Sequence, residues 1–159
     1  MNIDWMQVLI DLLVTCFGFG LALVGERWTE RLRARREANE LKKLIKEELE
    51  KILEDINKFN ENALDVQPLK IPSWESAINT GQVALLDVQV RNKLFHVYNT
   101  INEFNAWCSI HTNYYFEKGQ QNRLLIKELN RIKKNLLSIG VNKSDSDING
   151  AIEILEKEE

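Results

Sequence analysis

The sequence predicts an all-α protein, in which one N-terminal transmembrane helix continues into a long cytosolic helix that packs in a small helical bundle. Three observations support this fold class. An apolar run near the N-terminus is long enough to cross a bilayer. Apolar residues recur at helical spacing through most of the remaining chain, and no segment shows the alternating period of a strand.

The first expected element is the apolar run from Trp5 to Val24, which contains one ionisable side chain, Asp11. A helix of about 20 residues rises roughly 30 Å, the thickness of the hydrocarbon layer. A cleaved signal peptide is one alternative, but its positive charge would precede the apolar run. A buried helix of a soluble protein is the other, and apolar residues on every side of the helix argue against it.

Basic residues follow the apolar run and none precedes it. By the positive-inside rule, the N-terminus lies outside and everything after Gly25 lies in the cytoplasm of a single-pass cell-membrane protein. The arginines that set this topology, and that are placed to meet lipid headgroups, are Arg27, Arg31, Arg33, Arg35 and Arg36. Trp5 and Trp28 are expected at the two membrane interfaces.

The expected domains are a short extracytoplasmic N-terminus (1–4), a transmembrane helix (5–25), a basic juxtamembrane helix (26–40) and a cytosolic helical bundle (41–159).

One face of the predicted span carries only polar or small residues, while bulky apolar residues fill the other faces. Small residues let helices approach closely in lipid, and a carboxylate inside a membrane is relieved of its cost by facing other helices or a wet cavity. The sequence therefore predicts a homo-oligomer in which this face is packed or lines a pore. Its residues are Asp11, Thr15, Gly18, Ala22 and Gly25.

The helical pattern continues without Pro, or Gly after Gly25, until about residue 62. An apolar stripe here is wide enough for a bundle. It comprises Leu41, Leu44, Ile45, Leu49, Ile52, Leu53, Ile56 and Phe59.

Pro68 and Pro72 end this helix. Ser73 is the predicted N-cap of a short helix closed by Gly81, and Asp87 that of a longer helix over 88–112. A turn is expected over "NYYFEKGQ", then a helix over 120–139, a stop at Gly140 and a last short helix carrying Ile148, Ile152 and Leu155.

No phosphate-binding loop, dinucleotide fingerprint or nucleophile elbow is present, so we predict that the protein is not an enzyme and has no cofactor. Cys108 and His111 have ligand-like spacing but form only half of a zinc site, so no metal is expected. The net charge of −3 argues against binding to a nucleic-acid duplex.

Four basic residues recur at helical spacing in the predicted 120–139 helix: Arg123, Lys127, Arg131 and Lys134. They form either a solvated face or a stripe for a small anionic ligand or for lipid headgroups.

The segment "IPSWESAINTGQVALLD", followed by "LFHVYNTINEFN", resembles segments of small uncharacterised prokaryotic single-pass membrane proteins with a cytosolic helical domain. The residues that carry the resemblance are Trp74, Gly81, Leu85, Leu86, Leu94, Tyr98 and Asn105. The resemblance implies a helical fold and a bacterial or archaeal source. The same layout is similar to that of membrane effectors of antiphage defence, which is an analogy of architecture.

Two functional hypotheses follow. In the first, the protein is a self-associating membrane effector that forms a pore or perturbs the membrane under control of its cytosolic bundle. In the second, the span is an anchor, and the bundle is a scaffold or regulatory subunit that docks a cytosolic protein.

Overall fold

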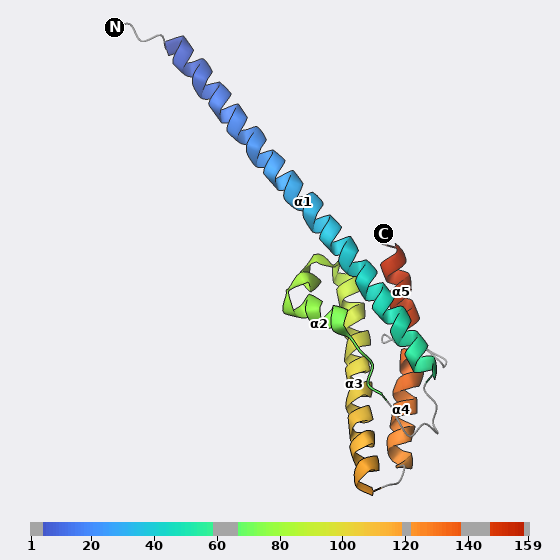
Figure 1. Cartoon of the computed structure of the whole chain (residues 1–159). Helices are drawn as coiled ribbons and strands as arrows, with labels where there is room; N and C mark the ends of the chain where they lie inside the picture. The colour runs from blue at the N-terminus through green and yellow to red at the C-terminus, as the bar shows by residue number, and fades with distance from the viewer. Residues whose placement is uncertain (1–4, 59–66, 119–121, 138–146, 158–159) are drawn as a thin grey trace. The chain divides into compact units, whose positions relative to one another are not determined.

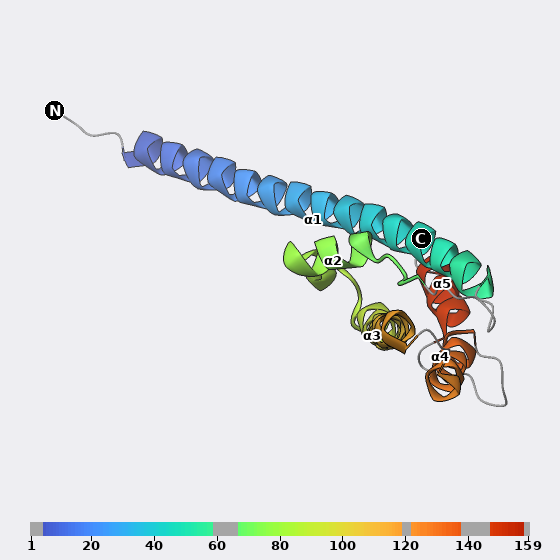
Figure 2. The same ribbon diagram turned by 60° about the horizontal axis from the view of Figure 1, so that its bottom comes forward.

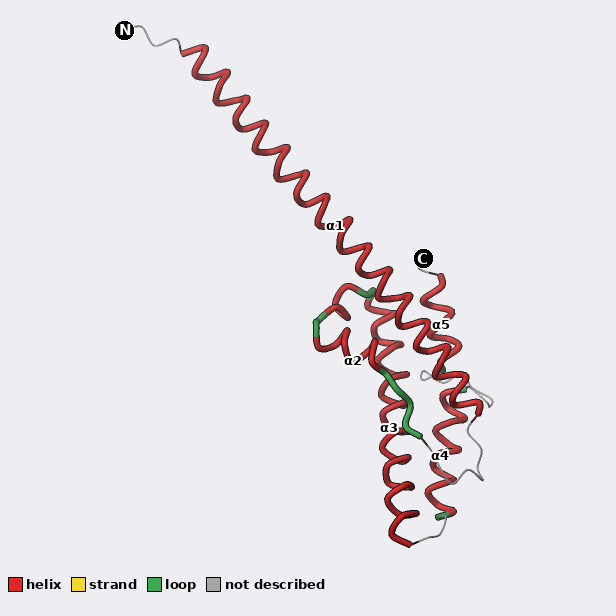
Figure 3. The backbone as a smooth tube through the Cα atoms, in the orientation of Figure 1, coloured by secondary structure: helices red, strands yellow, loops and turns green. Residues whose placement is uncertain are grey.

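The computed structural model describes residues 5–58, 67–118, 122–137 and 147–157 (Figure 1). Within these ranges the chain forms α1 (Trp5–Lys58), α2 (Pro72–Asn79), the 3-10 helix η1 (Gln82–Leu85), α3 (Val88–Lys118), α4 (Arg123–Leu136) and α5 (Ile148–Lys157). Helices and loops alone make up this part of the chain (Figure 3), which confirms the all-α prediction. The chain divides into two compact units, residues 1–37 and 38–159.

The first unit contains the N-terminal part of α1. Among the residues that the structure describes, one helix is long and apolar enough to cross a membrane, the stretch Leu12–Lys58, and none of its most apolar window is buried. Signal sequences near an N-terminus share this length and composition. The long predicted helix is confirmed as one continuous helix of 54 residues, whereas Phe59 lies outside the described residues.

The second unit is held together by a core to which all five α-helices contribute. From α1, side chains spaced four, four, three and four residues apart enter this core, which is the helical period the sequence shows. Both Figure 1 and Figure 2 show α5 beside this part of α1 and the antiparallel pair α3 and α4 next to each other. The α1 residues in the core are Leu41, Ile45, Leu49, Ile52 and Ile56. Leu44 was expected there, and this prediction is wrong, because 53% of its surface is exposed.

The short helices α2 and η1 follow the proline-containing segment. Pro72 is in the first turn of α2, where its missing N–H costs no helical hydrogen bond. The N-cap is Ile71, so the predicted cap Ser73 is wrong. Gly81 has φ of +73° and separates α2 from η1, as expected for a residue that ends a helix.

The α3–α4 hairpin is the largest helical pair of this unit. Asp87 accepts a hydrogen bond from the Gln89 N–H at 2.8 Å, which confirms it as the cap of α3. Residues 113–118 are the last turns of α3, so the turn predicted for "NYYFEKGQ" is wrong over this range. Asn122 caps α4 with a 3.0 Å hydrogen bond from the Leu124 N–H. Gly140, the predicted stop, lies outside the described residues.

Candidate functional site

The N-terminal part of α1 exposes large apolar side chains on every side. Their exposed fractions lie between 45% for Leu23 and 75% for Phe17. Contiguous apolar surface of this extent is not found on soluble monomers and marks contact with a membrane or with another protein. The residues are Leu9, Leu12, Leu13, Val14, Phe17, Phe19, Leu21, Leu23 and Val24.

The polar and small face runs along the same segment. A Cβ atom added at Gly18 or Gly25 would have no atom within 4 Å besides those of the adjacent residues and of its own helix backbone. Thr15 and Ala22 are exposed as well, and the side chain of Asp11 lies outside the described part. At Gly18 and Gly25 the described part of the chain leaves open space, so we expect bulky substitutions at these two glycines to affect mainly what packs against this face.

The juxtamembrane arginines are all exposed. Among the described residues, none of the five forms an ion pair or a hydrogen bond through its guanidinium group. Trp28 is also exposed. These arginines and Trp28 are therefore accessible to anionic or interfacial groups outside the chain.

In the second unit, a buried carboxylate joins three helices. Glu48 of α1 accepts hydrogen bonds from the Ser73 N–H at 2.6 Å and from the Trp74 N–H at 3.2 Å. The Tyr98 hydroxyl of α3 donates to the same carboxylate at 2.8 Å. Glu48 therefore does from a distant helix what an N-cap side chain does locally: it accepts from the free N–H groups at the start of α2.

Aromatic rings close this cluster. Trp74 stacks on Tyr98 with a centroid distance of 4.4 Å and meets the edge of Phe95 at 5.1 Å. Only 2% of Trp74 is exposed, and the residue belongs to the core of the second unit. Burial, followed by the negative charge of Glu48, raises the pKa of Tyr98, so its hydroxyl stays protonated and donates.

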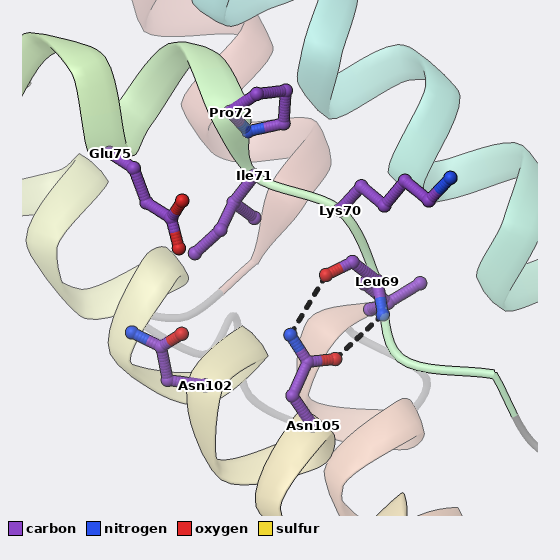
Figure 4. Close-up of a pocket in the computed structure, with 7 residues that line it drawn as sticks. All are labelled: Leu69, Lys70, Ile71, Pro72, Glu75, Asn102 and Asn105. Carbon is purple, nitrogen blue, oxygen red and sulfur yellow. Dashed lines mark hydrogen bonds between the residues drawn. The ribbon is translucent and has the colours of Figure 1, made fainter.

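A small pocket opens beside this cluster, between the segment 69–71, the first turn of α2 and α3 (Figure 4). The Asn105 amide donates to the Leu69 carbonyl at 2.8 Å and accepts from the Leu69 N–H at 2.7 Å. This pair of bonds holds the extended segment against α3. The pocket has a volume of about 310 Å³. On its rim, Glu75 and Asn102 make no side-chain hydrogen bond or ion pair with other described residues.

The basic residues predicted on α4 are all exposed on this helix. Arg131 is not a free cation, because it donates to Glu128 at 2.7 Å and to Glu103 of α3 at 2.8 Å. The hydrogen bond to Glu128 raises the pKa of Arg131 most, and the bond to Glu103 raises it further. Arg123, Lys127 and Lys134 form no ion pair with the described residues, so three of the four remain available to an anion.

Cys108 and His111 are both buried on α3. Burial raises the pKa of the Cys108 thiol to about 12, which disfavours the thiolate form that binds metals. Neither ring nitrogen of His111 has a hydrogen-bond partner among the described residues. No group of three or more potential metal ligands occurs in the part of the chain that the structure describes.

The sequence did not point to Glu48 or to the role of Asn105. Glu48 lies in a run of charged helical residues, and its partners are 25 or more positions away. Its place between buried Ile45, Leu49 and Ile52 was the one available signal, because it puts a charge at the edge of the apolar stripe. Comparison with protein-family models, with curated proteins and with solved structures finds no match to the chain.

Proposed function

We propose that the protein is a single-pass membrane protein that self-associates through one face of its span. It then forms a pore or perturbs the membrane, under control of its cytosolic bundle. The observation that carries this proposal is the set of exposed apolar side chains on all sides of α1 between Leu12 and Val24. The hydrocarbon chains of lipids make apolar contacts with such a surface on all sides at once.

The open face of the span supports self-association. Gly18 and Ala22 are one helical turn apart, and small residues at this spacing allow close helix packing in lipid. Asp11 lies on the same face by helical spacing. Burial in an assembly lowers the cost of a carboxylate in the membrane, which is about 2.5–3.5 kcal/mol on insertion scales.

The Glu48 cluster supports control by the bundle. The helix that carries the apolar segment also carries Glu48, and the N-terminus of α2 and Tyr98 of α3 bind that carboxylate directly. A ligand or partner that shifts α2 or α3 therefore acts on α1 itself.

The open pocket beside Leu69 favours a second candidate, a membrane-tethered scaffold or regulatory subunit. The unpaired Glu75 and Asn102 on its rim would meet a docked cytosolic protein. In this case the span is only an anchor, and Asp11 has no functional role.

Membrane insertion is tested by two measurements on the full chain. A reporter fused after Glu159 should behave as cytoplasmic, because the arginines follow the span. The protein should also resist alkaline extraction from membranes. A periplasmic or extracellular reporter signal would overturn the orientation, and release of the protein at alkaline pH would overturn the span.

Replacement of Asp11 separates the two candidates. In a pore, Asp11→Leu removes a charged ring that sets cation preference, so conductance in planar bilayers should change, while Asp11→Glu should keep it. In an anchor, Asp11→Leu should leave cellular activity intact. Full activity of Asp11→Leu, with no conductance from the wild-type chain, would defeat the pore proposal.

A further inference from the structure

The outer end of the α3–α4 hairpin exposes an apolar face within the second unit. In Figure 1 this end of the hairpin extends past the C-terminal end of α1 and past α2 and α5, so none of these described helices lies beside it there. Leu124 is 73% exposed and Ile110 is 48% exposed. Trp107 is half-buried and packs on the edge of the core.

The Glu103–Arg131 ion pair sets the register of this face. Its atoms are 2.8 Å apart, so the two residues lie at the same level of the antiparallel hairpin. Ile110 follows Glu103 by seven residues and Leu124 precedes Arg131 by seven, which is about two helical turns in each case. Ile110 and Leu124 are therefore also at one level, on the same side of the hairpin as the ion pair.

We propose that this face packs against the same face of a second copy of the chain, with the two-fold axis parallel to the helices, so that α3 of each copy lies opposite α4 of the other. This inference deepens the proposed self-association and rests on it: it adds a contact outside the span.

Charge complementarity selects this occupant and this arrangement. At the level of the ion pair, α3 contributes an acid and α4 a base. The two-fold axis along the helices places Glu103 of the first copy opposite the arginine of the second copy. By symmetry, Arg131 of the first copy lies opposite the glutamate of the second. About two helical turns away from the ion pair, Ile110 then faces the second copy's leucine. The two hairpins together form a four-helix bundle.

The composition of the face agrees with this assignment. Tryptophan and arginine with aliphatic neighbours are typical of the residues that dominate protein interfaces. Lys127, three residues after Leu124 and four before Arg131, is exposed on the same side of α4 and adds a positive charge to this face. Here the exposed arginine is already held by Glu103 and Glu128, so its side chain is ordered before association.

The apolar contact is tested with a pair of matched variants of the full chain in detergent. Leu124→Glu places a charge in the proposed interface, and Phe116→Glu places one at an even more exposed apolar residue, 80% exposed, on a different side of α3. Leu124→Glu should weaken association about tenfold or more, as expected for an interface hot spot. Phe116→Glu should have the dissociation profile of the wild type.

A charge-exchange experiment tests the interface by partner preference, which does not depend on comparing the stability of a variant with that of the wild type. Chains carrying Glu103→Arg have two bases at this level, and chains carrying Arg131→Glu have two acids. When the two differently tagged chains are co-expressed, mixed oligomers should exceed the statistical proportion, because each base then meets an acid of the other copy. A role of the ion pair within one chain predicts no such preference.

The outcomes separate this inference from the proposed function. Statistical mixing, together with equal dissociation of Leu124→Glu and Phe116→Glu, would overturn the hairpin interface while leaving association through the span intact. Weakening by Leu124→Glu, with no effect of Gly18→Leu, would support the hairpin interface and overturn packing through the span. A wild-type chain that is monomeric at every concentration would overturn both.

Discussion

Removal of the Glu48 carboxylate is the sharpest test of how the bundle is attached to α1. In Glu48→Ala, the Trp74 N–H and the Tyr98 hydroxyl lose their acceptor inside the core. An unsatisfied buried donor costs about 1–3 kcal/mol, so the two together should lower the free energy of unfolding by about 2–6 kcal/mol. The Ser73 N–H is only partly buried, and water can replace its acceptor.

This loss is a large fraction of the stability of a typical domain, about 5–15 kcal/mol. Glu47→Ala is the matched control, because the neighbouring glutamate is exposed and forms no ion pair with other described residues. It should change stability by less than about 0.5 kcal/mol. Glu48→Gln, which retains one acceptor oxygen, should fall between the two.

The assay is urea unfolding of the full chain in micelles, followed by near-ultraviolet circular dichroism, to which the Trp74–Tyr98 stack contributes. Equal midpoints and slopes for Glu48→Ala and Glu47→Ala would refute the argument that the carboxylate joins the three helices.

Three further predictions concern the same unit, and a fourth compares Cys108 of this unit with Cys16 of the first. Trp74→Ala should cost about 3–5 kcal/mol in the same unfolding assay; an unchanged transition would instead make Trp74 a partner-binding residue. Asn105→Leu removes both bonds to the Leu69 backbone and should cost about 2 kcal/mol, also by urea unfolding. Stability should fall as the pH rises above about 9–10, because burial raises the pKa of Cys108 and Tyr98 and the unfolded chain ionises first; unfolding measured against pH should show this slope, and Tyr98→Phe should reduce it. At neutral pH a maleimide should modify Cys16 in detergent but not Cys108, and rapid labelling of Cys108 would contradict its burial.

Periodic features of the fold were predictable from the sequence. The spacing of Leu41, Ile45, Leu49 and Ile52 predicted the buried face of α1. Leu44 shares the apolar character of these residues but lies beyond the arc that the other helices cover. The width of an apolar stripe in the sequence does not show how much of that stripe the neighbouring helices cover in the fold.

Features that depend on distant partners were not predictable. Ser73 has a typical capping side chain, yet Pro72 starts the helix one residue earlier and Glu48 accepts from its N–H groups. The turn expected at 113–118 was wrong because α3 continues through this polar and aromatic segment to Lys118, although the last buried residue of the helix is His111. The basic stripe on α4 was predicted as a unit, but the contact between Arg131 and Glu103 required the hairpin register.

The central claim, a membrane span that self-associates through its small-residue face, is tested most directly by the oligomeric mass of the full chain in lipid nanodiscs. Gly18 and Gly20 make a matched pair, because a Cβ atom added at either has no atom within 4 Å besides those of the adjacent residues and of its own helix backbone, and only Gly18 lies on that face. The wild type and Gly20→Leu should be oligomers of the same mass, and Gly18→Leu should shift to smaller species without loss of insertion. A monomeric wild type, or equal masses for Gly18→Leu and Gly20→Leu, would contradict the claim.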